Sequence, residues 1–437
     1  MLKSSIVRAI ALFVISFVVL AACKEGGKGV NTLSSDDNLL RFVPADTPYV
    51  FASGKPLPDD LVDSLEPRID EILKAYQIVL REIARSVIAK NAEGMDVDDI
   101  QRASAIVDEL TTLLSIQGMR DAGFERNSGF VMFGHGLLPV IRIEVSDPAL
   151  FDAAIVRIEK AAGEAMDKGA IDGQSYRYVG DDDGSLVLAA MEDSVVFTFI
   201  PADFNDGQKR QLLGLTLPEK NIGGADTLPA IISKYEYSDY YIGFIDNQRI
   251  ASTFIDEPKG LDAALMGAVG DDAPQISDVC KAEIRDMVGV APRIVFGYDK
   301  ITEDQMDGSF VLELRPDLAQ GLTSIAAMVP GLGQDPGGLM SMGFSVNLLE
   351  MRSFYEARLD AMEADPFECE YFQEFQAGVA KGRDALNQPV PPIVYGFRGF
   401  NLVVDDVGDF DMANNQPPQE IDASLLVAME DAQAIVA

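Results

Sequence analysis

Residues 129–158 read GFVMFGHGLLPVIRIEVSDPALFDAAIVRI, and this stretch decides the fold class. Two runs rich in Val, Ile, Phe and Met, at 129–134 and 138–145, predict neighbouring strands. Asp147 and Pro148 predict the start of a helix, because the aspartate side chain accepts hydrogen bonds from free backbone amides and proline is tolerated in the first turn. The stretch therefore predicts the order strand, strand, helix.

The chain after this helix continues as strands. The helix itself carries one apolar face, made by Phe151, Ile155, Ile158 and Ala162. Three further strands are predicted at 176–179, 185–190 and 194–200, with turns at 180–184 and 192–193. The order β-β-α-β-β-β predicts an α+β fold, in which helices pack on one face of a mainly antiparallel sheet.

A helical hairpin is predicted ahead of this region, after a short strand at 43–52. Its first apolar face consists of Leu61, Leu65, Ile69, Leu73, Tyr76, Leu80, Ile83 and Val87. Its second consists of Ile100, Ala103, Val107, Leu110 and Leu114. We expect the hairpin to cover the sheet. The alternative is that it presents a groove to a partner helix.

A divergent internal duplication is visible. SLVLAAMED at 185–193 recurs as SLLVAMED at 424–431, and 141–158 has a looser echo in 344–362, where Phe354 matches Phe151. The strand at 48–52 likewise resembles 292–297. We therefore expect two related α+β units, each a mainly antiparallel sheet with helices on one face. The expected bounds are 39–258, which contains the helical hairpin, and 259–437, which contains a helical insertion.

Composition excludes several classes of protein. The 437 residues include 35 Lys+Arg and 70 Asp+Glu, a formal net charge of -35 that repels the phosphates of nucleic acids. The hydrophobic fraction of 48% is too high for a disordered chain. A single His excludes any site that needs two imidazoles.

The N-terminus has the pattern of a signal peptide. Lys3 and Arg8 precede an apolar run at 9–22, which is too short for a hydrocarbon core of about 30 Å. Leu20-Ala21-Ala22-Cys23 resembles the lipobox of bacterial lipoproteins, in which a peptidase cuts before the Cys and the thiol is acylated. We expect a signal peptide at 1–22, and a lipidated Cys23 with a flexible tether at 23–38. An ordinary secretory signal with a chance Cys is the alternative.

The opening of the mature chain adds to this resemblance. FVPADTPY at 42–49 and GLLPVIR at 136–142 resemble envelope lipoproteins of proteobacteria, and Lys24 after the Cys is typical of the outer-membrane class. The resemblance implies a protein held on the outer membrane by palmitate-type acyl chains on Cys23. The resemblance leaves open whether the folded part of the chain faces the periplasm or the cell surface. No activity and no catalytic residue transfers from it.

Two other thiols, Cys280 and Cys369, remain if Cys23 is acylated. An even number of thiols in an oxidising compartment predicts a disulfide, which would pin the helical insertion of the second unit. The alternative is two separate buried thiols. A metal site lacks further Cys and His ligands.

No catalytic motif is present. The sequence holds no H-E-x-x-H, G-x-S-x-G, S-x-x-K or P-loop pattern. His135 stands between two glycines beside a predicted strand. A general base is the alternative, but no Ser or Cys partner is evident in sequence, so we interpret it as a surface or turn residue. We predict no catalytic residues and no cofactor.

Two weaker features complete the set of candidate sites. Acidic turns offer carboxylate oxygens for calcium, although solvated turns are the simpler interpretation; the candidates are Asp181, Asp183, Asp405 and Asp409. Tyrosines cluster at 235–241, where they suit either an interface or a strand; they are Tyr235, Tyr237, Tyr240 and Tyr241.

The functional hypothesis is a non-enzymatic outer-membrane lipoprotein that acts as an interaction or assembly module for an envelope protein partner. The lipobox and the missing catalytic motifs favour it. One alternative is a ligand-binding lipoprotein with a pocket between the two units. The other is a hydrolase that uses carboxylates alone.

Overall fold

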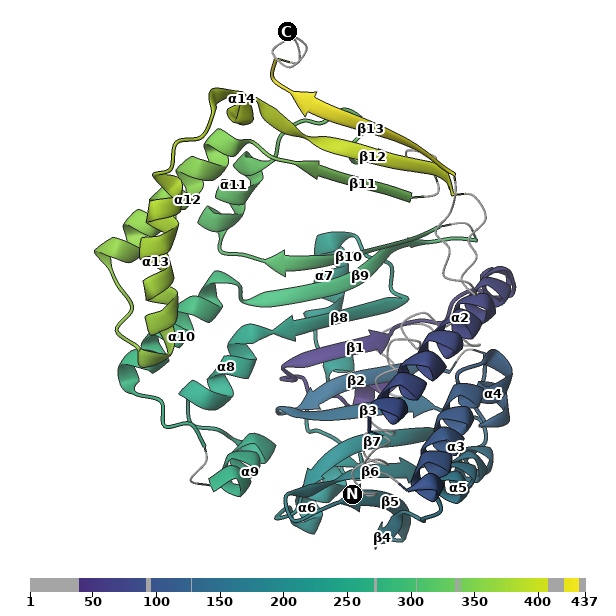
Figure 1. Cartoon of the computed structure of the whole chain (residues 1–437). Coiled ribbons are helices and arrows are strands. Elements are labelled where there is room, and N and C mark those ends of the chain that lie inside the picture. The colour runs from purple at the N-terminus through teal and green to yellow at the C-terminus, as the bar shows by residue number, and fades with distance from the viewer. Residues whose placement is uncertain are drawn as a thin grey trace. The chain divides into compact units, whose positions relative to one another are not determined.

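The computed structural model describes residues 39–91, 96–126, 128–270, 273–303, 305–334, 338, 340–407 and 420–431. The chain divides into two compact units (Figure 1). The first unit contains Met1–Gln275 and Ala291–Glu313, and the second contains Ile276–Val290 and Leu314–Ala437. Both mix helices with antiparallel strands, so the α+β class is confirmed.

The first unit is built on a ten-stranded sheet with the order β10-β9-β8-β1-β2-β3-β7-β6-β5-β4. Every neighbouring pair is antiparallel. The strands are β1 (Tyr49–Ser53), β2 (Phe130–His135), β3 (Leu138–Glu144), β4 (Asp167–Ile171), β5 (Gln174–Gly180), β6 (Gly184–Ala190), β7 (Ser194–Pro201), β8 (Tyr241–Asp246), β9 (Arg293–Ile301) and β10 (Met306–Glu313).

Four helices cover one face of this sheet: α2 (Asp59–Asn91), α3 (Val97–Leu113), α4 (Ile116–Asp121) and α5 (Pro148–Ala162). Leu65 and Leu73 of α2 are buried there with Ile106 of α3, so the helical hairpin covers the sheet as expected. The apolar stripe of α2 extends beyond this core, because Ile83 is 55% exposed.

Helix α5 forms where the sequence predicts it. The Asp147 side chain accepts hydrogen bonds from the backbone N–H groups of Ala149 and Leu150, and Gly163 ends the helix in the left-handed conformation. Phe151 packs edge-on against Phe197 of β7, with ring centroids 6.2 Å apart. The helix is thereby fixed on the sheet through its predicted apolar face.

The opposite face of the sheet is also covered, which differs from the expected arrangement with helices on one face. Its core includes residues of η1 (Leu39–Phe42), α6 (Asp206–Leu212), η3 (Ile222–Gly224), α7 (Thr227–Tyr235) and α9 (Gly260–Val269). Helix α8 (Asn247–Ile255) directly follows β8. Strand β7 shows the reason, because Val195 and Phe197 are buried in one core while Val196 and Ile200 are buried in the other. A strand that is apolar on both sides needs cover on both faces.

The division between the units also differs from the expected boundary at 258/259. Strand β9 pairs with β8, and Val295 lies opposite Phe244 in this register. Val295 is fully buried in the same core as Phe244. The strand at 292–297, which the duplication assigned to a second unit, therefore extends the first sheet.

The second unit combines a three-stranded sheet with helices. The sheet has the order β11-β12-β13, with β11 (Met340–Ser345), β12 (Phe397–Val407) and β13 (Ile421–Met429) antiparallel. The helices are α10 (Asp278–Val290), α11 (Pro316–Ile325), α12 (Leu348–Ala364), η5 (Glu370–Phe372), α13 (Gln373–Leu386) and α14 (Pro392–Tyr395). Within the described part of the chain, no helix is both long and apolar enough to cross a bilayer.

The duplicated segments adopt similar local structures in different surroundings. The SLVLAAMED segment supplies β6, which pairs with both β5 and β7. The SLLVAMED segment lies in β13, which pairs with β12 alone among the described residues. In both units a strand is followed directly by a helix, as β3-α5 and β11-α12. The shared order is local and does not extend to the arrangement of the sheets.

Candidate interaction surface

One side of the three-stranded sheet is made of apolar side chains. Residues paired across antiparallel strands point to the same side of a sheet, and side chains alternate along each strand. Phe344, Phe400 and Val427 form one row in this register. We define the apolar face as Met340, Met342 and Phe344 of β11, Phe400, Leu402 and Val404 of β12, and Ala423, Leu425 and Val427 of β13.

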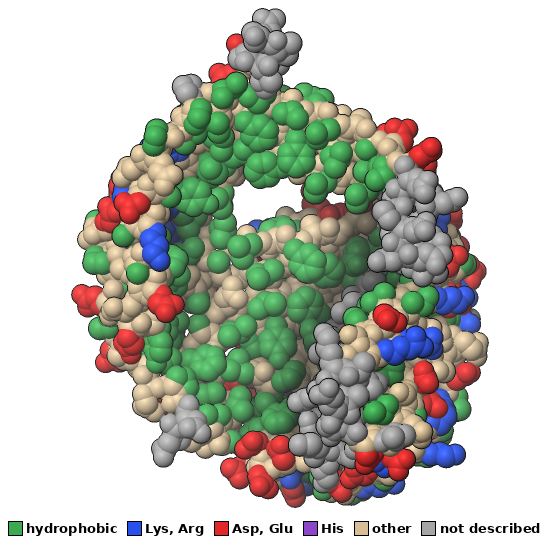
Figure 2. All heavy atoms as spheres, viewed as in Figure 1, with side chains coloured by type: hydrophobic (Ala, Val, Ile, Leu, Met, Phe, Trp, Pro, Cys, Tyr) green, Lys and Arg blue, Asp and Glu red, His purple; other side chains and the backbone are tan. Residues whose placement is uncertain are grey.

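The strands β11 and β13 expose their apolar-face residues to solvent, whereas Val404 of β12 is buried. Leu425 is 63% exposed, Met342 is 56% exposed and Phe344 is 49% exposed. Figure 2 shows hydrophobic side chains gathered over these three strands. Single exposed apolar residues are normal, but a contiguous apolar patch marks a binding surface in a soluble protein. The face is therefore the candidate functional site of the second unit.

The reverse side of the same sheet is more polar and is partly covered. It carries Ser341, Asn401 and Ser424 between its apolar residues. The absence of side chains at Gly343 and Gly399 lets Leu332 and Val329 approach this side closely. The alternation of the strands thus makes the uncovered side the more apolar one, which is the opposite of an ordinary half-buried sheet.

The helices of the second unit pack on one another instead of covering the apolar face. Phe354 of α12 lies against Gly321 of α11, where an added Cβ would collide with its ring. On its other side α12 is joined to α13 by ion pairs from Arg383 to Asp360 and Glu363. No residue of α12 is fully buried.

An acidic cluster lies at one end of the sheet. Asp406 of β12 and Asp422 of β13 are directly opposite each other, next to a bulge between Val404 and Asp406. Asp405 and Glu420 are exposed beside them. Within the described residues, none of these four carboxylates forms an ion pair. Because Ala423 and Leu425 lie on the apolar face and side chains alternate along β13, Asp422 and its partner Asp406 lie on the reverse side of the sheet. Like charges opposite each other destabilise a strand pair.

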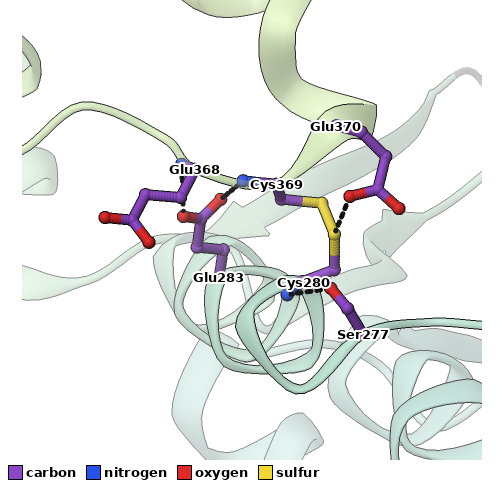
Figure 3. Close-up of a disulfide and its surroundings, with 6 residues drawn as sticks. All are labelled: Ser277, Cys280, Glu283, Glu368, Cys369 and Glu370. Atoms are coloured by element: carbon purple, nitrogen blue, oxygen red, sulfur yellow. Dashed lines mark hydrogen bonds between the residues drawn. A yellow bond between two sulfur atoms is a disulfide. The ribbon is translucent and has the colours of Figure 1, made fainter.

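The disulfide of the second unit joins Cys280 and Cys369, the pairing expected from the number of thiols, with an S–S distance of 2.05 Å (Figure 3). It links α10 to the segment before η5, and both sulfurs belong to buried residues. The Glu283 carboxylate accepts hydrogen bonds from the backbone N–H groups of Glu368 (2.7 Å) and Cys369 (3.2 Å). These bonds fix the same segment a second time.

Glu370 lies beside the disulfide, with its Oε2 3.3 Å from the Cys280 Sγ (Figure 3). Cys280, Cys369 and Glu370 are the one group of potential metal ligands found among the described residues. Both sulfurs are bonded to each other, so neither is available as a thiolate ligand. With the disulfide formed, Cys280 and Cys369 have a structural role.

The four candidate tyrosines do not form one surface cluster. Tyr237 is buried in one core of the first unit and stacks on Tyr235, with centroids 5.6 Å apart. Tyr241 is buried in the other core beside Phe130. Tyr240 packs beneath the Lys55 ammonium group. Burial of Tyr237 and Tyr241 removes these two from any binding surface.

Tyr235 belongs to an ion-pair network centred on Glu313. The carboxylate of Glu313 accepts hydrogen bonds from Arg293 (2.8 Å), Lys234 (2.7 Å) and the Tyr235 hydroxyl (2.5 Å). Partial burial acts to raise the pKa of Glu313, but the hydrogen bonds outweigh it and hold the pKa at about 2. The network joins α7 to the edge strand β10.

His135 lies at the end of β2, within a partly buried polar cluster. Its Nδ1 is buried and has no hydrogen-bond partner among the described residues. Asp262 of α9 accepts hydrogen bonds from the Leu137 N–H (2.7 Å) and the Thr253 hydroxyl (3.2 Å). Burial lowers the pKa of His135, although Asp46 and Asp262 act in the opposite direction. The cluster ties the β2–β3 turn to α8 and α9.

The calcium candidates do not assemble into a site in the described part of the chain. Asp181 Oδ1 accepts a hydrogen bond from the Asp183 N–H, which is an ordinary turn contact. Asp405 is exposed beside the bulge of β12. Asp409 and the lipidation candidate Cys23 lie outside the described residues.

A groove of about 440 Å³ lies between α2 and α4 in the first unit. Its carboxylates are paired: Glu66 with Arg120 and Arg126, Asp63 with Arg126, and Asp70 with Lys74. Exposed ion pairs of this kind contribute little free energy. The carboxylates that line this groove are therefore engaged in ion pairs with arginine or lysine.

The sequence analysis missed two features of the structure. The apolar face had a readable signal, because MSMGF at 340–344 and ASLLV at 423–427 place an apolar residue at nearly every second position. No signal in the sequence indicated that Arg142 is buried. Its guanidinium lies 3.6 Å from the Phe42 ring and donates to the Ser194 hydroxyl and the Leu213 carbonyl.

Comparison of the whole chain with protein families, with curated proteins and with solved structures found no match.

Proposed function

We propose that this chain is a non-enzymatic, lipid-anchored protein of the bacterial outer membrane, which recruits another envelope protein through the apolar face of its second unit. The observation that carries the proposal is the exposure of this face, with Leu425 63% and Met340 58% accessible. Covering such a patch is favourable by about 25 cal/mol for each Å² of apolar surface removed from water. The face therefore supplies a driving force for association.

The anchor part of the proposal rests on the N-terminal sequence. The lipobox-like Leu20-Ala21-Ala22-Cys23 places an acyl acceptor directly after an apolar segment. Two or more acyl chains hold a protein stably on a membrane. The short tether at 24–38 would keep the body within on the order of 20 Å of that membrane.

The recruitment part is tested by site-specific photocrosslinking in living cells. Benzoylphenylalanine replaces Leu425 on the apolar face, and in a matched control it replaces Ile78, which is 66% exposed on α2 of the first unit. We expect a discrete adduct of higher mass at position 425 and none at position 78. The absence of an adduct at 425, or equal adducts at both positions, would contradict recruitment through this face.

The anchor is tested separately by metabolic labelling with an alkyne fatty acid. The wild-type protein is expected to incorporate the label and to sediment with outer membranes. Cys23→Ala is expected to lose both properties. Labelling that survives in Cys23→Ala would show that the sequence resemblance to a lipobox is misleading.

A further inference from the structure

Two segments of the second unit are joined twice at the same place. Cys280, in the first turn of α10, forms a disulfide with Cys369, which directly precedes η5. Independently of this bond, the Glu283 carboxylate accepts hydrogen bonds from the backbone N–H groups of Glu368 and Cys369 (Figure 3). Glu283 follows Cys280 by three residues on α10, so the two side chains are neighbours on the helix surface. Breaking the disulfide therefore leaves the two segments connected.

The reduced cysteines would stay close together for this reason. The Cα atoms of Cys280 and Cys369 are 4.7 Å apart. The Ser277 hydroxyl accepts a hydrogen bond of 3.2 Å from the Cys280 N–H and so fixes the start of α10. Neither this bond nor those to Glu283 involves a sulfur atom. Reduction would thus produce two adjacent thiols on a backbone that is already held in place.

Glu370 brings a third ligand atom to the two sulfurs. Its Oε2 lies 3.3 Å from the Cys280 Sγ, and the ligand atoms of Cys280, Cys369 and Glu370 all lie within 4.8 Å of one another. Zinc binds thiolate sulfur at about 2.3 Å and carboxylate oxygen at about 2.0–2.2 Å, so two ligands of a tetrahedral zinc ion are roughly 3.5–3.8 Å apart. Once unbonded, the sulfurs need only separate to about that distance.

Charge and access also favour a cation at this position. Cys280 and Cys369 are 0% and 1% exposed, and two buried thiolates beside a carboxylate would repel one another unless a cation neutralised them. Glu370 is exposed, so an ion can enter from its side and a water molecule can complete the coordination. The formal net charge of -35 further attracts cations to the chain.

We infer that reduction converts this disulfide into a binding site for a thiophilic divalent cation of the zinc type, with Cys280, Cys369 and Glu370 as its protein ligands. The reductant is a dithiol. Each sulfur of the protein disulfide gains one electron and one proton, and the dithiol becomes a disulfide. The incoming ion then displaces the two thiol protons and binds both thiolates.

Metal and disulfide are thus alternative links between α10 and the segment before η5. Both connect the same two cysteines, and one excludes the other because a bonded sulfur is not a thiolate. This inference concerns the helices of the second unit, and it depends neither on the lipid anchor nor on the apolar face.

The test uses the processed chain carrying Cys23→Ser, in which Cys280 and Cys369 are the only thiols of the sequence. The protein is reduced with dithiothreitol, freed of it under anaerobic conditions, and titrated with Co²⁺ as a spectroscopic probe and then with Zn²⁺. We expect one Co²⁺ per reduced chain, with the charge-transfer absorption of thiolate ligands, and its displacement by Zn²⁺. Reduced protein without this absorption would overturn the inference.

Variants separate the three ligands from the general acidity of the chain. Glu370→Gln is expected to weaken Zn²⁺ binding at least about tenfold. The matched control Glu368→Gln removes an exposed carboxylate two residues away, keeps the backbone hydrogen bond to Glu283, and is expected to bind like the parent. Equal affinities of the two variants would overturn the assignment of Glu370. Circular dichroism confirms that each variant keeps its fold, as expected for substitutions at exposed positions.

Thermal unfolding distinguishes this site from weak binding to surface carboxylates. Zn²⁺ is expected to raise the midpoint of thermal unfolding of the reduced parent, because a ligand that binds the folded state stabilises it. It should leave the oxidised parent and the reduced Cys280→Ser/Cys369→Ser variant unchanged. An equal rise in that variant would assign the binding to surface carboxylates and overturn the inference.

The rate of reoxidation tests whether metal and disulfide exclude each other. Glutathione disulfide takes two electrons from the reduced pair, re-forms the bond and leaves as two glutathione thiols. Since a free thiolate must attack the oxidant, Zn²⁺ is expected to slow this reaction at least about tenfold. An unchanged rate at saturating Zn²⁺ would show that the ion lies elsewhere.

Discussion

Asp406 of β12 and Asp422 of β13 lie directly opposite each other in an antiparallel register, next to a bulge. Cross-strand pairs of like charge destabilise a sheet, and pairs of opposite charge stabilise it by roughly 0.2–1 kcal/mol. The second unit therefore tolerates a stability cost at one end of its three-stranded sheet.

Asp422→Lys is expected to convert this repulsion into an ion pair with Asp406. We expect the free energy of unfolding to rise by about 0.5 kcal/mol or more at low salt, with a smaller gain at high salt. Urea denaturation of the oxidised protein measures it. Asp182→Lys, in the exposed β5–β6 turn, makes the same charge change without an opposing aspartate. A similar gain there would attribute the effect to net charge instead of the cross-strand pair.

Removal of the disulfide is expected to destabilise the second unit. Cys280 and Cys369 are 89 residues apart, and loop-closure entropy gives a contribution of roughly 4.5 kcal/mol for a loop of that size. Cys280→Ala/Cys369→Ala should lower the midpoint of thermal unfolding, as should dithiothreitol acting on the wild-type protein. Glu283 would still accept the backbone hydrogen bonds of the same segment. Unchanged unfolding after reduction would show that those bonds are sufficient.

His135 is expected to make stability depend on pH. Because burial lowers its pKa in the folded state, protonation favours the unfolded chain. The free energy of unfolding should be greatest above the ordinary histidine pKa of about 6.5 and should fall as the pH drops below it. His135→Gln should flatten the profile between about pH 7.5 and 5.5. Chemical denaturation at several pH values checks this, and parallel profiles for both proteins would contradict it.

Arg142 is expected to be the most sensitive arginine of the first unit. It is buried, and desolvation lowers its pKa to about 10 even though Asp193 acts to raise it. Arg142→Met removes its contacts with Phe42, Ser194 and Leu213, and should cost about 2–3 kcal/mol. Arg157→Met removes an exposed ion pair with Glu109 and should cost less than about 1 kcal/mol. Equal costs would show that burial of the guanidinium is unimportant.

Local sequence signals predicted the elements whose patterns depend on residues close together in the chain. Asp147, Pro148 and the apolar spacing after them define α5, and the structure has this helix with the predicted cap. The helical hairpin and the strands at 185–190 and 194–200 are present for the same reason. The disulfide followed from counting thiols once Cys23 was set aside.

Long-range arrangement was harder to predict. The duplication assigned the strand at 292–297 to the second unit, whereas β9 extends the first sheet by pairing with β8. A strand sequence records which of its sides are apolar, but several neighbours satisfy that requirement equally well. Similarly, the clustered tyrosines were separated because Tyr237 and Tyr241 point into different cores.

By itself the sequence determined the α+β class, the helical hairpin, helix α5, five of the strands between 129 and 200, and the excess of negative charge, since these depend on composition and on short-range periodicity. Only the tertiary structure decided that the helices of the second unit leave the apolar side of β11–β13 uncovered, that helices lie on both faces of the large sheet, and that Arg142 is buried. Burial is a property of packing between distant segments, and local patterns contain no information on which partner a given apolar face meets.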